Sequence, residues 1–287
     1  MLQFLADTAV PASLFLLMLV VGTEVTREDF RGLAENVQAV LLGSAGQLLV
    51  LPAIALAINV ALSPPPAIAA GLLLLSLSPN GGISNSYCYL ARCNVLLSAT
   101  ITAVGTALCL VTIPAWLALL PNVPGFNVAL IEVPAATIVA QLLVLMVLPL
   151  VMGMLVRRAY PEKVANAEKL LRWLSVGVVA VILAAAVATV RGELSGLLFD
   201  IGLSATLFIV AAMMVGWLLG HGLGSRDRPV LVIEAGVRNV GVALLLGGTM
   251  LTPESFGIFA SFLTGYFIWE VVIMLAYVRY TARHLEG

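Results

Sequence analysis

Charged residues are scarce in this chain, because Asp, Glu, Lys and Arg together make up only 10% of its 287 residues. An ordinary soluble domain carries about 25%, so the composition excludes that class. The formal net charge of −1 gives no indication of nucleic-acid binding. The two histidines, His221 and His284, suggest neither a metal site nor a catalytic pair, and we do not expect an enzyme.

Cysteine is also rare. Cys88, Cys93 and Cys109 lack the spacing of a metal site and fall in apolar or nearly apolar stretches. A disulfide framework is therefore not expected, and we interpret the three cysteines as packing residues.

Apolar residues dominate, at 61% of the chain and a mean hydropathy of +1.10. Long apolar runs without alternation predict membrane-spanning helices. The first run contains Asp7 and lacks both a basic start and a small-residue cleavage pattern, so we predict a span rather than a signal peptide. Polar and Pro/Gly-rich breaks predict nine spans, at residues 3–22, 36–62, 66–91, 94–118, 129–156, 171–190, 198–222, 228–250 and 255–280.

Lys and Arg are distributed unevenly between the predicted loops. One side collects twelve of them and the other only Arg191. Nine spans put the two chain ends on opposite sides, and positive residues favour the cytoplasm. We expect a multi-pass protein of the cytoplasmic membrane, with the N-terminus outside and the C-terminus in the cytoplasm. The twelve are Arg27, Arg31, Arg92, Arg157, Arg158, Lys163, Lys169, Arg172, Arg226, Arg228, Arg279 and Arg283.

Two predicted spans are interrupted in the middle. Span 66–91 contains the sequence Pro-Asn-Gly-Gly at 79–82, which cannot continue an ordinary helix. Span 228–250 places Glu234 and Arg238 near the membrane centre, where charges persist only inside protein or beside a wet cavity. A pair of interrupted helices in corresponding positions is typical of inverted-repeat transporters, in which half-helix ends form an ion site.

Several polar side chains near these breaks could bind an ion. Ser84 and Asn85 carry the hard oxygen donors that Na⁺ prefers, although both could equally cap a half-helix. Ser98 and Thr102 are four residues apart on one helical face, where hydroxyls often bond back to the helix instead. Glu234 favours the ion site, because a carboxylate at this depth needs a cation.

Two long motifs resemble one known family. The stretch from Pro79 to Thr102, PNGGISNSYCYLARCNVLLSATIT, closely resembles the first signature of the bile acid:sodium symporters. The stretch EAGVRN, from Glu234 to Asn239, resembles their second signature, usually Glu-x-Gly-x-Gln-Asn. GTEVTREDF, from Gly22 to Phe30, is similar to the family's first cytoplasmic turn, so the resemblance covers nearly the whole chain.

The resemblance implies an all-α membrane protein of two inverted repeats. Two interrupted helices would cross in a core domain, and substrate would bind between the core and a separate panel domain. By this correspondence residues 1–30 and 123–196 form the panel, and residues 31–122 and 197–287 form the core.

The resemblance also implies two sodium sites. The first would use Ser84, Asn85, Ser98, Thr102 and Glu234, all of which keep residue types able to bind Na⁺. The second uses backbone carbonyls, the signature glutamine and an earlier glutamine, for which Gln47 is the match.

Arg238 stands where the family has the signature glutamine. A guanidinium offers five donors, no acceptor and a permanent charge, so we predict that the second site does not bind Na⁺. One interpretation makes Arg238 a built-in cation that replaces the ion and pairs with Glu234. The other has it face the cleft and bind a carboxylate or sulfonate of the substrate.

Other positions give weaker indications of substrate contacts. Asn239 matches the signature asparagine and is expected to touch substrate where the helices cross, and Thr264 lies on the last span. Glu270 on that span could contact substrate, accept protons or pair with an arginine. Asn80 replaces a family glycine, and because Asn tolerates the left-handed conformation we expect the break to persist.

We therefore expect a transporter that imports an organic anion, either a bile-acid-like steroid or a small carboxylate or sulfonate, with one Na⁺ by alternating access. The lipid bilayer and the small anion are the expected partners, and no protein partner is predicted. Two alternatives remain: a sodium-independent or proton-coupled carrier of the same fold, and a membrane receptor that does not transport.

Overall fold

The computed structural model describes residues 10–24, 36–119 and 135–285, and all regular elements in these ranges are helices. The predicted all-α class is thus confirmed for the described residues. The elements are α2 (Val10–Glu24), α4 (Val37–Ala45), η2 (Gly46–Val50), α5 (Leu51–Leu62), α6 (Pro66–Leu77), α7 (Ile83–Leu90), α8 (Val95–Leu119), α9 (Ala135–Leu142), η4 (Leu143–Val147), α10 (Leu148–Ala159), α11 (Pro161–Thr189), α12 (Arg191–Leu219), α13 (Arg228–Gly236), α14 (Val240–Met250) and α15 (Pro253–Leu285).

Within the described residues, six helical stretches are long and apolar enough to cross a membrane. They are Val37–Leu62, Val95–Leu119, Ala140–Ala159, Gly192–Leu219, Arg228–Met250 and Glu254–Leu285. The predicted total of nine spans goes beyond these six and stays a prediction. Two of the nine, 3–22 and 129–156, begin in residues outside the described ranges.

Two of the long helices contain a π-helical turn, and each turn is followed by a proline. The turn η2 precedes Pro52, and η4 precedes Pro149. Proline has no N–H and its ring clashes with the preceding turn, so the backbone hydrogen bonds must shift there. The wider turn keeps each stretch continuous from one end to the other.

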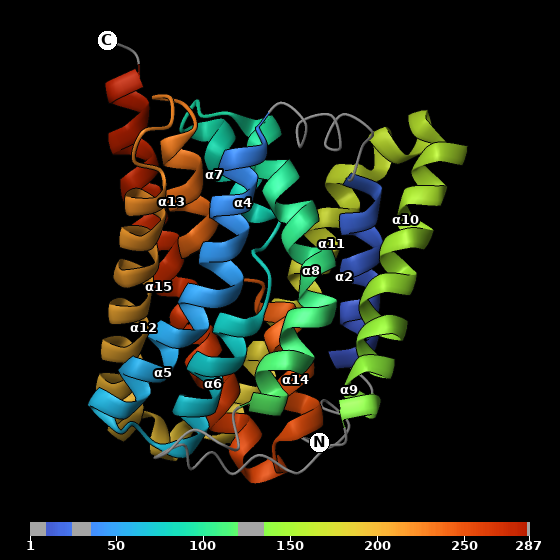
Figure 1. The fold of residues 1–287 in the computed structure, drawn as a ribbon. Coiled ribbons are helices and arrows are strands. Elements are labelled where there is room, and N and C mark those ends of the chain that lie inside the picture. The colour runs from blue at the N-terminus through green and yellow to red at the C-terminus, as the bar shows by residue number, and fades with distance from the viewer. Residues whose placement is uncertain (1–9, 25–35, 120–134, 286–287) are drawn as a thin grey trace.

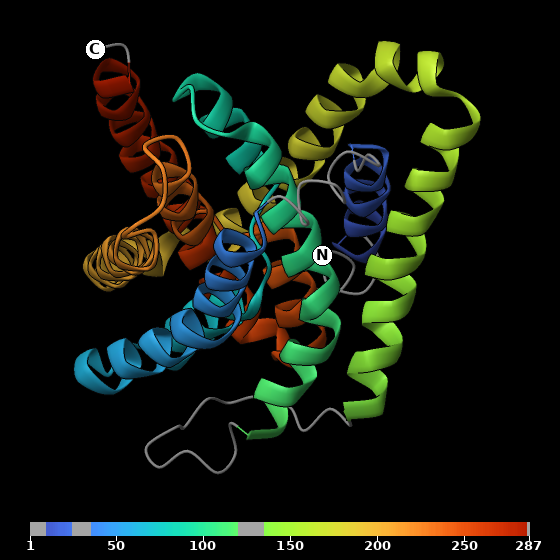
Figure 2. The same cartoon turned by 45° about the horizontal axis from the view of Figure 1, so that its top comes forward.

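Helices α2, α10 and α11 stand together on one side of the molecule, with α2 packed against both of the others (Figure 1, Figure 2). Helix α9 and the turn η4 run directly into α10 and belong with it, and the other helices form the larger group. Here α12 packs on α13 and α15, while α6 packs on α5, α14 and α15. The two groups meet where α11 lies along α15 and where α2 touches α14.

Two turns in the larger group are tied together. The backbone N–H of Asn94, just before α8, donates to the carbonyl of Arg226 at 3.1 Å, and its side-chain amide donates to Asp227 at 2.8 Å. The α7–α8 turn is thereby fixed to the start of α13. The two interrupted pairs, α6–α7 and α13–α14, are thus joined where α7 ends and α13 begins.

Two glycines allow α2 and α10 to touch backbone to backbone. A Cβ atom on Gly22 would lie 2.1 Å from the carbonyl oxygen of Leu150, and one on Gly153 would lie 2.1 Å from that of Leu19. Small residues at helix contacts permit such close approach in membranes. Any side chain at either position would have to push the helices apart.

We expect Gly153→Ala to lower the stability of the protein by about 1–3 kcal/mol, the usual range for overpacking a tight contact. Thermal unfolding in detergent would measure this as a lower melting temperature. The matched control is Gly177→Ala on α11, where a Cβ would meet nothing within 4 Å. Equal melting temperatures for the two variants would contradict the predicted backbone contact.

Candidate functional site

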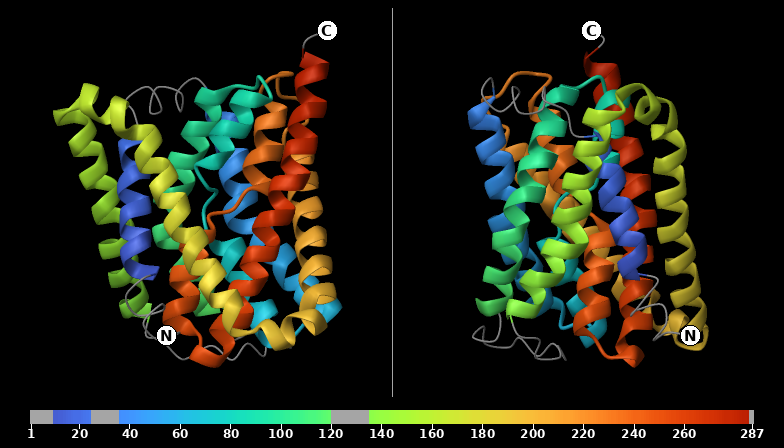
Figure 3. Two further views of the ribbon diagram at one scale, coloured as in Figure 1. Left: turned by 180° about the vertical axis from the view of Figure 1, so that it is seen from behind. Right: turned by 90° about the vertical axis from the view of Figure 1, so that its right-hand side faces the viewer.

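The two interrupted helix pairs cross at their breaks, at mid-height of the molecule (Figure 3, left). The chain is extended at Ser78 between α6 and α7, and at Val237 between α13 and α14. The N–H of Asn239 donates to the carbonyl of Pro79 at 2.8 Å. A Cβ on Gly81 would lie 3.4 Å from the carbonyl oxygen of Arg238, so glycine permits this close crossing.

Asn80 does not use the left-handed conformation that we expected of it. Among the described residues other than glycine, only Ser63 and Arg92 have positive φ. The break persists because the extended backbone at Ser78 and the crossing contacts end the helix without a left-handed residue. Asn80 instead donates from its amide nitrogen to the Thr102 hydroxyl at 2.9 Å.

The five residues predicted for the first sodium site gather around Glu234. The Ser98 hydroxyl lies 2.5 Å from one carboxylate oxygen of Glu234, and the Thr102 hydroxyl lies 3.2 Å from the other. Ser98 is also 2.7 Å from the amide oxygen of Asn85. Ser84 is close enough to Glu234 to interact with it, yet its buried hydroxyl has no hydrogen bond of good geometry.

This cluster has more oxygen acceptors than protons to bond them. A hydroxyl carries one proton, so Ser98 cannot donate to both Glu234 and Asn85, although both oxygens lie within 2.7 Å of it. Glu234 is fully buried, and Ser84 and Ser98 are equally inaccessible. Oxygens crowded in this way suit a small hard cation that draws them together.

The guanidinium of Arg238 is buried, and its hydrogen bonds run toward α6 and η2. It donates to the carbonyl oxygens of Ser76, at 3.3 Å, and of Ser78, and it reaches the amide oxygen of Gln47 at 3.5 Å. Its hydrogen bonds go to these oxygens, whereas Glu234 is bonded to Ser98 and Thr102. The charges of Arg238 and Glu234 nevertheless interact through space, and their pairing stays a prediction.

The amide group of Asn80 lies between these two clusters. While its nitrogen donates to Thr102, its buried oxygen has no hydrogen-bond partner in the described part of the chain. A Cβ on Gly105 would be 3.5 Å from that oxygen and 3.6 Å from the amide oxygen of Gln47. No sequence pattern indicated this position between the clusters, because an Asn that follows a proline is typical of a turn.

A cavity of about 330 Å³ opens beside the crossing point. Its wall combines the start of α7, residues 238–241, a stretch of α11 and one side of α15. Arg238, Asn239 and Thr264, three of the four positions predicted to contact substrate, line it, and Phe267 adds an aromatic surface. The α11 wall, which includes Leu183 and Ala184, was not predicted, because apolar helix faces in membranes are alike in sequence.

Two polar side chains at the cavity make hydrogen bonds within the protein. The amide oxygen of Asn239 accepts from the N–H of Val242 and caps α14, and the Thr264 hydroxyl donates to the carbonyl of Ala260 at 2.8 Å. Glu270 is not among the residues that line the cavity. It is buried near Tyr87 of α7 instead.

Comparison with known proteins gives a consistent picture. A family model described as "Sodium Bile acid symporter family" matches residues 11–196. The chain is 28% identical over 247 residues to the "Uncharacterized sodium-dependent transporter YocS" of Bacillus subtilis, a match that covers 84% of this chain and 74% of the relative.

Two eukaryotic relatives also match. The "Probable sodium/metabolite cotransporter BASS2, chloroplastic" of Oryza sativa is 27% identical over 248 residues, which cover 86% of this chain but only 58% of the plant protein. The human "Ileal sodium/bile acid cotransporter" is 24% identical over 291 residues, covering 99% of this chain and 82% of the relative.

Proposed function

Since the chain belongs to the sodium bile acid symporter family, we propose that it is a secondary transporter that imports an organic anion together with Na⁺ by alternating access. Members of this family are transporters rather than enzymes, and the apolar helices make the chain a multi-pass membrane protein. The observation that carries the proposal is the buried oxygen cluster around Glu234.

Na⁺ would bind in that cluster, among Ser84, Asn85, Ser98, Thr102 and Glu234. The carboxylate supplies the charge, while the hydroxyl and amide oxygens replace the hydration shell of the ion. The cluster joins α7, α8 and α13. An ion bound there would hold both breaks in one arrangement, which would couple sodium binding to the shape of the cavity.

Arg238 would take the place of a second sodium ion. Its guanidinium donates to two backbone carbonyls and to Gln47, which are the kinds of oxygen ligand that a cation would use. A tethered charge cannot move across the membrane, so transport would use one Na⁺ per cycle. Import of a monoanion with one Na⁺ is electroneutral, and only the sodium concentration gradient would then drive uptake.

The substrate would bind in the cavity with its anionic group near the crossing. Helices α7 and α14 both begin at the cavity wall, at Ile83 and Val240, and helix N-termini attract anions. The Asn239 amide nitrogen would donate to the anion as well. Because the guanidinium of Arg238 is engaged with Ser76 and Ser78, we do not assign it to substrate binding.

The two groups of helices fit a panel and a core. The panel would comprise residues 1–30 and 123–196, and the core residues 31–122 and 197–287, in two inverted repeats with nine spans. The cavity lies between α11 of the panel and the core, so relative movement of the groups would open it alternately to either side.

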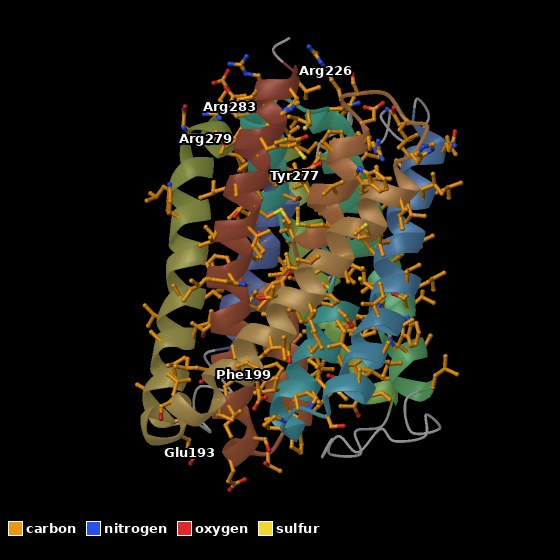
Figure 4. The ribbon with its side chains drawn as sticks, turned by 90° about the vertical axis from the view of Figure 1, so that its left-hand side faces the viewer. Glu193, Phe199, Arg226, Tyr277, Arg279 and Arg283 are labelled. Atoms are coloured by element: carbon orange, nitrogen blue, oxygen red, sulfur yellow. The ribbon has the colours of Figure 1, made fainter. Side chains whose placement is uncertain are left out.

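We place the protein in the cytoplasmic membrane with its C-terminus inside. Arg226, Arg279 and Arg283 lie at the end of the molecule where the chain terminates, and Glu193 lies at the opposite end (Figure 4). This arrangement supports the proposed orientation, because positive residues favour the cytoplasmic side.

Sodium-specific stabilisation of the purified protein would test the proposal. We expect NaCl to raise the melting temperature above that in KCl at equal ionic strength, because an ion that binds only the folded state stabilises it. Thr102→Val should weaken apparent sodium affinity by about tenfold, since losing one ligand oxygen costs about 1–2 kcal/mol.

Thr106→Val provides the matched control, because Thr106 is a buried threonine one turn further along α8. It should leave the sodium dependence unchanged. If NaCl and KCl stabilise the wild type equally, the sodium site is absent, and a sodium-independent or proton-coupled carrier becomes the better proposal. Equal losses of affinity in both variants would argue against Thr102 as a ligand.

A further inference from the structure

A second buried carboxyl group lies apart from the sodium cluster, at Glu270 on α15. Its side chain is only 2% exposed, and its Oε1 atom has no hydrogen-bond partner in the described part of the chain. One turn earlier, the hydroxyl of Tyr266 donates to the carbonyl of Gly236 at 2.8 Å. This bond fixes the middle of α15 against the end of α13, so the position of Glu270 is set by a rigid contact.

The group that faces Glu270 is Tyr87 on α7. Tyr87 is 4% exposed, and its hydroxyl also has no hydrogen-bond partner of good geometry among the described residues. The two side chains nevertheless lie close enough to interact. Two polar groups on different helices thus meet inside the protein with hydrogen-bonding capacity left over, which is uncommon without a functional reason.

On α6, α12, α13 and α14, the described charged groups have other partners or lie elsewhere. Helices α6 and α14 carry no titratable residue. On α13, Glu234 is bonded to Ser98 and Thr102, and Arg228 lies over the ring of Trp217. Arg238, in the break that follows α13, donates to the carbonyls of Ser76 and Ser78. The charged residues of α12 lie within its first ten residues. Glu193, one of them, is at the opposite end of the molecule from Arg283 (Figure 4).

An ionised carboxylate buried in the membrane without a cation is strongly unfavourable, and the neutral acid is the form that such a site stabilises. We propose that Glu270 is a proton-binding site, in which the protonated carboxyl group faces the hydroxyl of Tyr87 across the α7–α15 interface. The ligand is H⁺, and no residue of the sodium cluster takes part. The site therefore goes beyond the proposed sodium-coupled function and does not depend on it.

The cavity lies on the side of α15 that carries Glu270. Phe267 lines the cavity, and Glu270 lies three residues further along the same face of α15. Water that enters the cavity would reach this face of the helix. Glu270 would then release or take up its proton as the cavity is wetted and closed, and the occupancy of the cavity would be linked to protonation.

Infrared spectroscopy of the purified protein in saturating NaCl at neutral pH would test this. We expect the carbonyl band of a protonated carboxylic acid in the wild type and its loss in Glu270→Gln. The band should persist in Glu254→Gln, which changes an exposed residue at the start of the same helix. Tyr87→Phe should shift its frequency, because the neighbouring hydroxyl is removed. Transfer to D₂O should shift it too if the proton exchanges.

Two results would overturn the proposal. If the wild type has no such band, Glu270 is ionised. If the band survives in Glu270→Gln, it belongs to another carboxyl group. Melting of the same samples in NaCl and KCl separates this proposal from the sodium site. If the wild type melts equally in both salts, but Glu270→Gln still loses the band, the proton site is supported and only sodium coupling is rejected.

Discussion

Glu234→Gln is expected to abolish the sodium-specific stabilisation of the protein. The carboxylate provides the only formal negative charge in the predicted ligand set, and a pair of unit charges 4 Å apart at an effective dielectric constant of 20 is worth about 4 kcal/mol. Loss of that interaction lowers sodium affinity by roughly 10³-fold. Melting curves in NaCl and KCl should then coincide over the accessible range of concentration.

The substitution is conservative in shape, which makes the result specific. A glutamine can still bond to the hydroxyls of Ser98 and Thr102, so the fold should persist and melting in KCl should change little. Glu254→Gln, which removes an exposed acid, should keep the full sodium effect. A sodium response that survives Glu234→Gln would place the ion elsewhere.

Arg238→Gln is expected to lower stability in KCl and to make the sodium dependence steeper. A buried acceptor left without a donor costs about 1–3 kcal/mol, and the carbonyls of Ser76 and Ser78 and the Gln47 amide lose their donor. Glutamine supplies an acceptor where the guanidinium had none. A second Na⁺ could then bind, so sodium should recover much of the lost stability.

Sodium titrations of the melting temperature would measure this. The wild type should follow binding of one ion, whereas Arg238→Gln should show cooperative binding with a Hill slope above one. Arg238→Lys is the control, because it keeps the positive charge and should retain single-ion behaviour despite losing the planar fork. An unchanged slope in Arg238→Gln would show that the arginine does not replace an ion.

Part of the site could be predicted because its signals are local. Glu234 has to find a cation or hydroxyl partners at its depth in the membrane, and the four-residue spacing of Ser98 and Thr102 puts two hydroxyls on one face. Both hydroxyls bond to Glu234. For Arg238 the same reasoning required partners for a buried charge but did not identify the carbonyls of Ser76 and Ser78.

The helical class and the positions of the breaks follow from local sequence. In a membrane no water is available to backbone groups, so an apolar run must become a helix, and a Pro-Asn-Gly-Gly sequence must interrupt it. These constraints act within a few neighbouring residues. They hold whatever the rest of the chain does.

Which groups meet across the helices depends instead on the packing of the folded chain. Every residue carries a carbonyl oxygen, so no sequence pattern marks Ser76 and Ser78 as partners of Arg238. The contact between Glu270 and Tyr87 and the α11 wall of the cavity depend on how apolar helix faces pack. Such faces are nearly interchangeable in sequence, and the packing of the whole bundle selects among them.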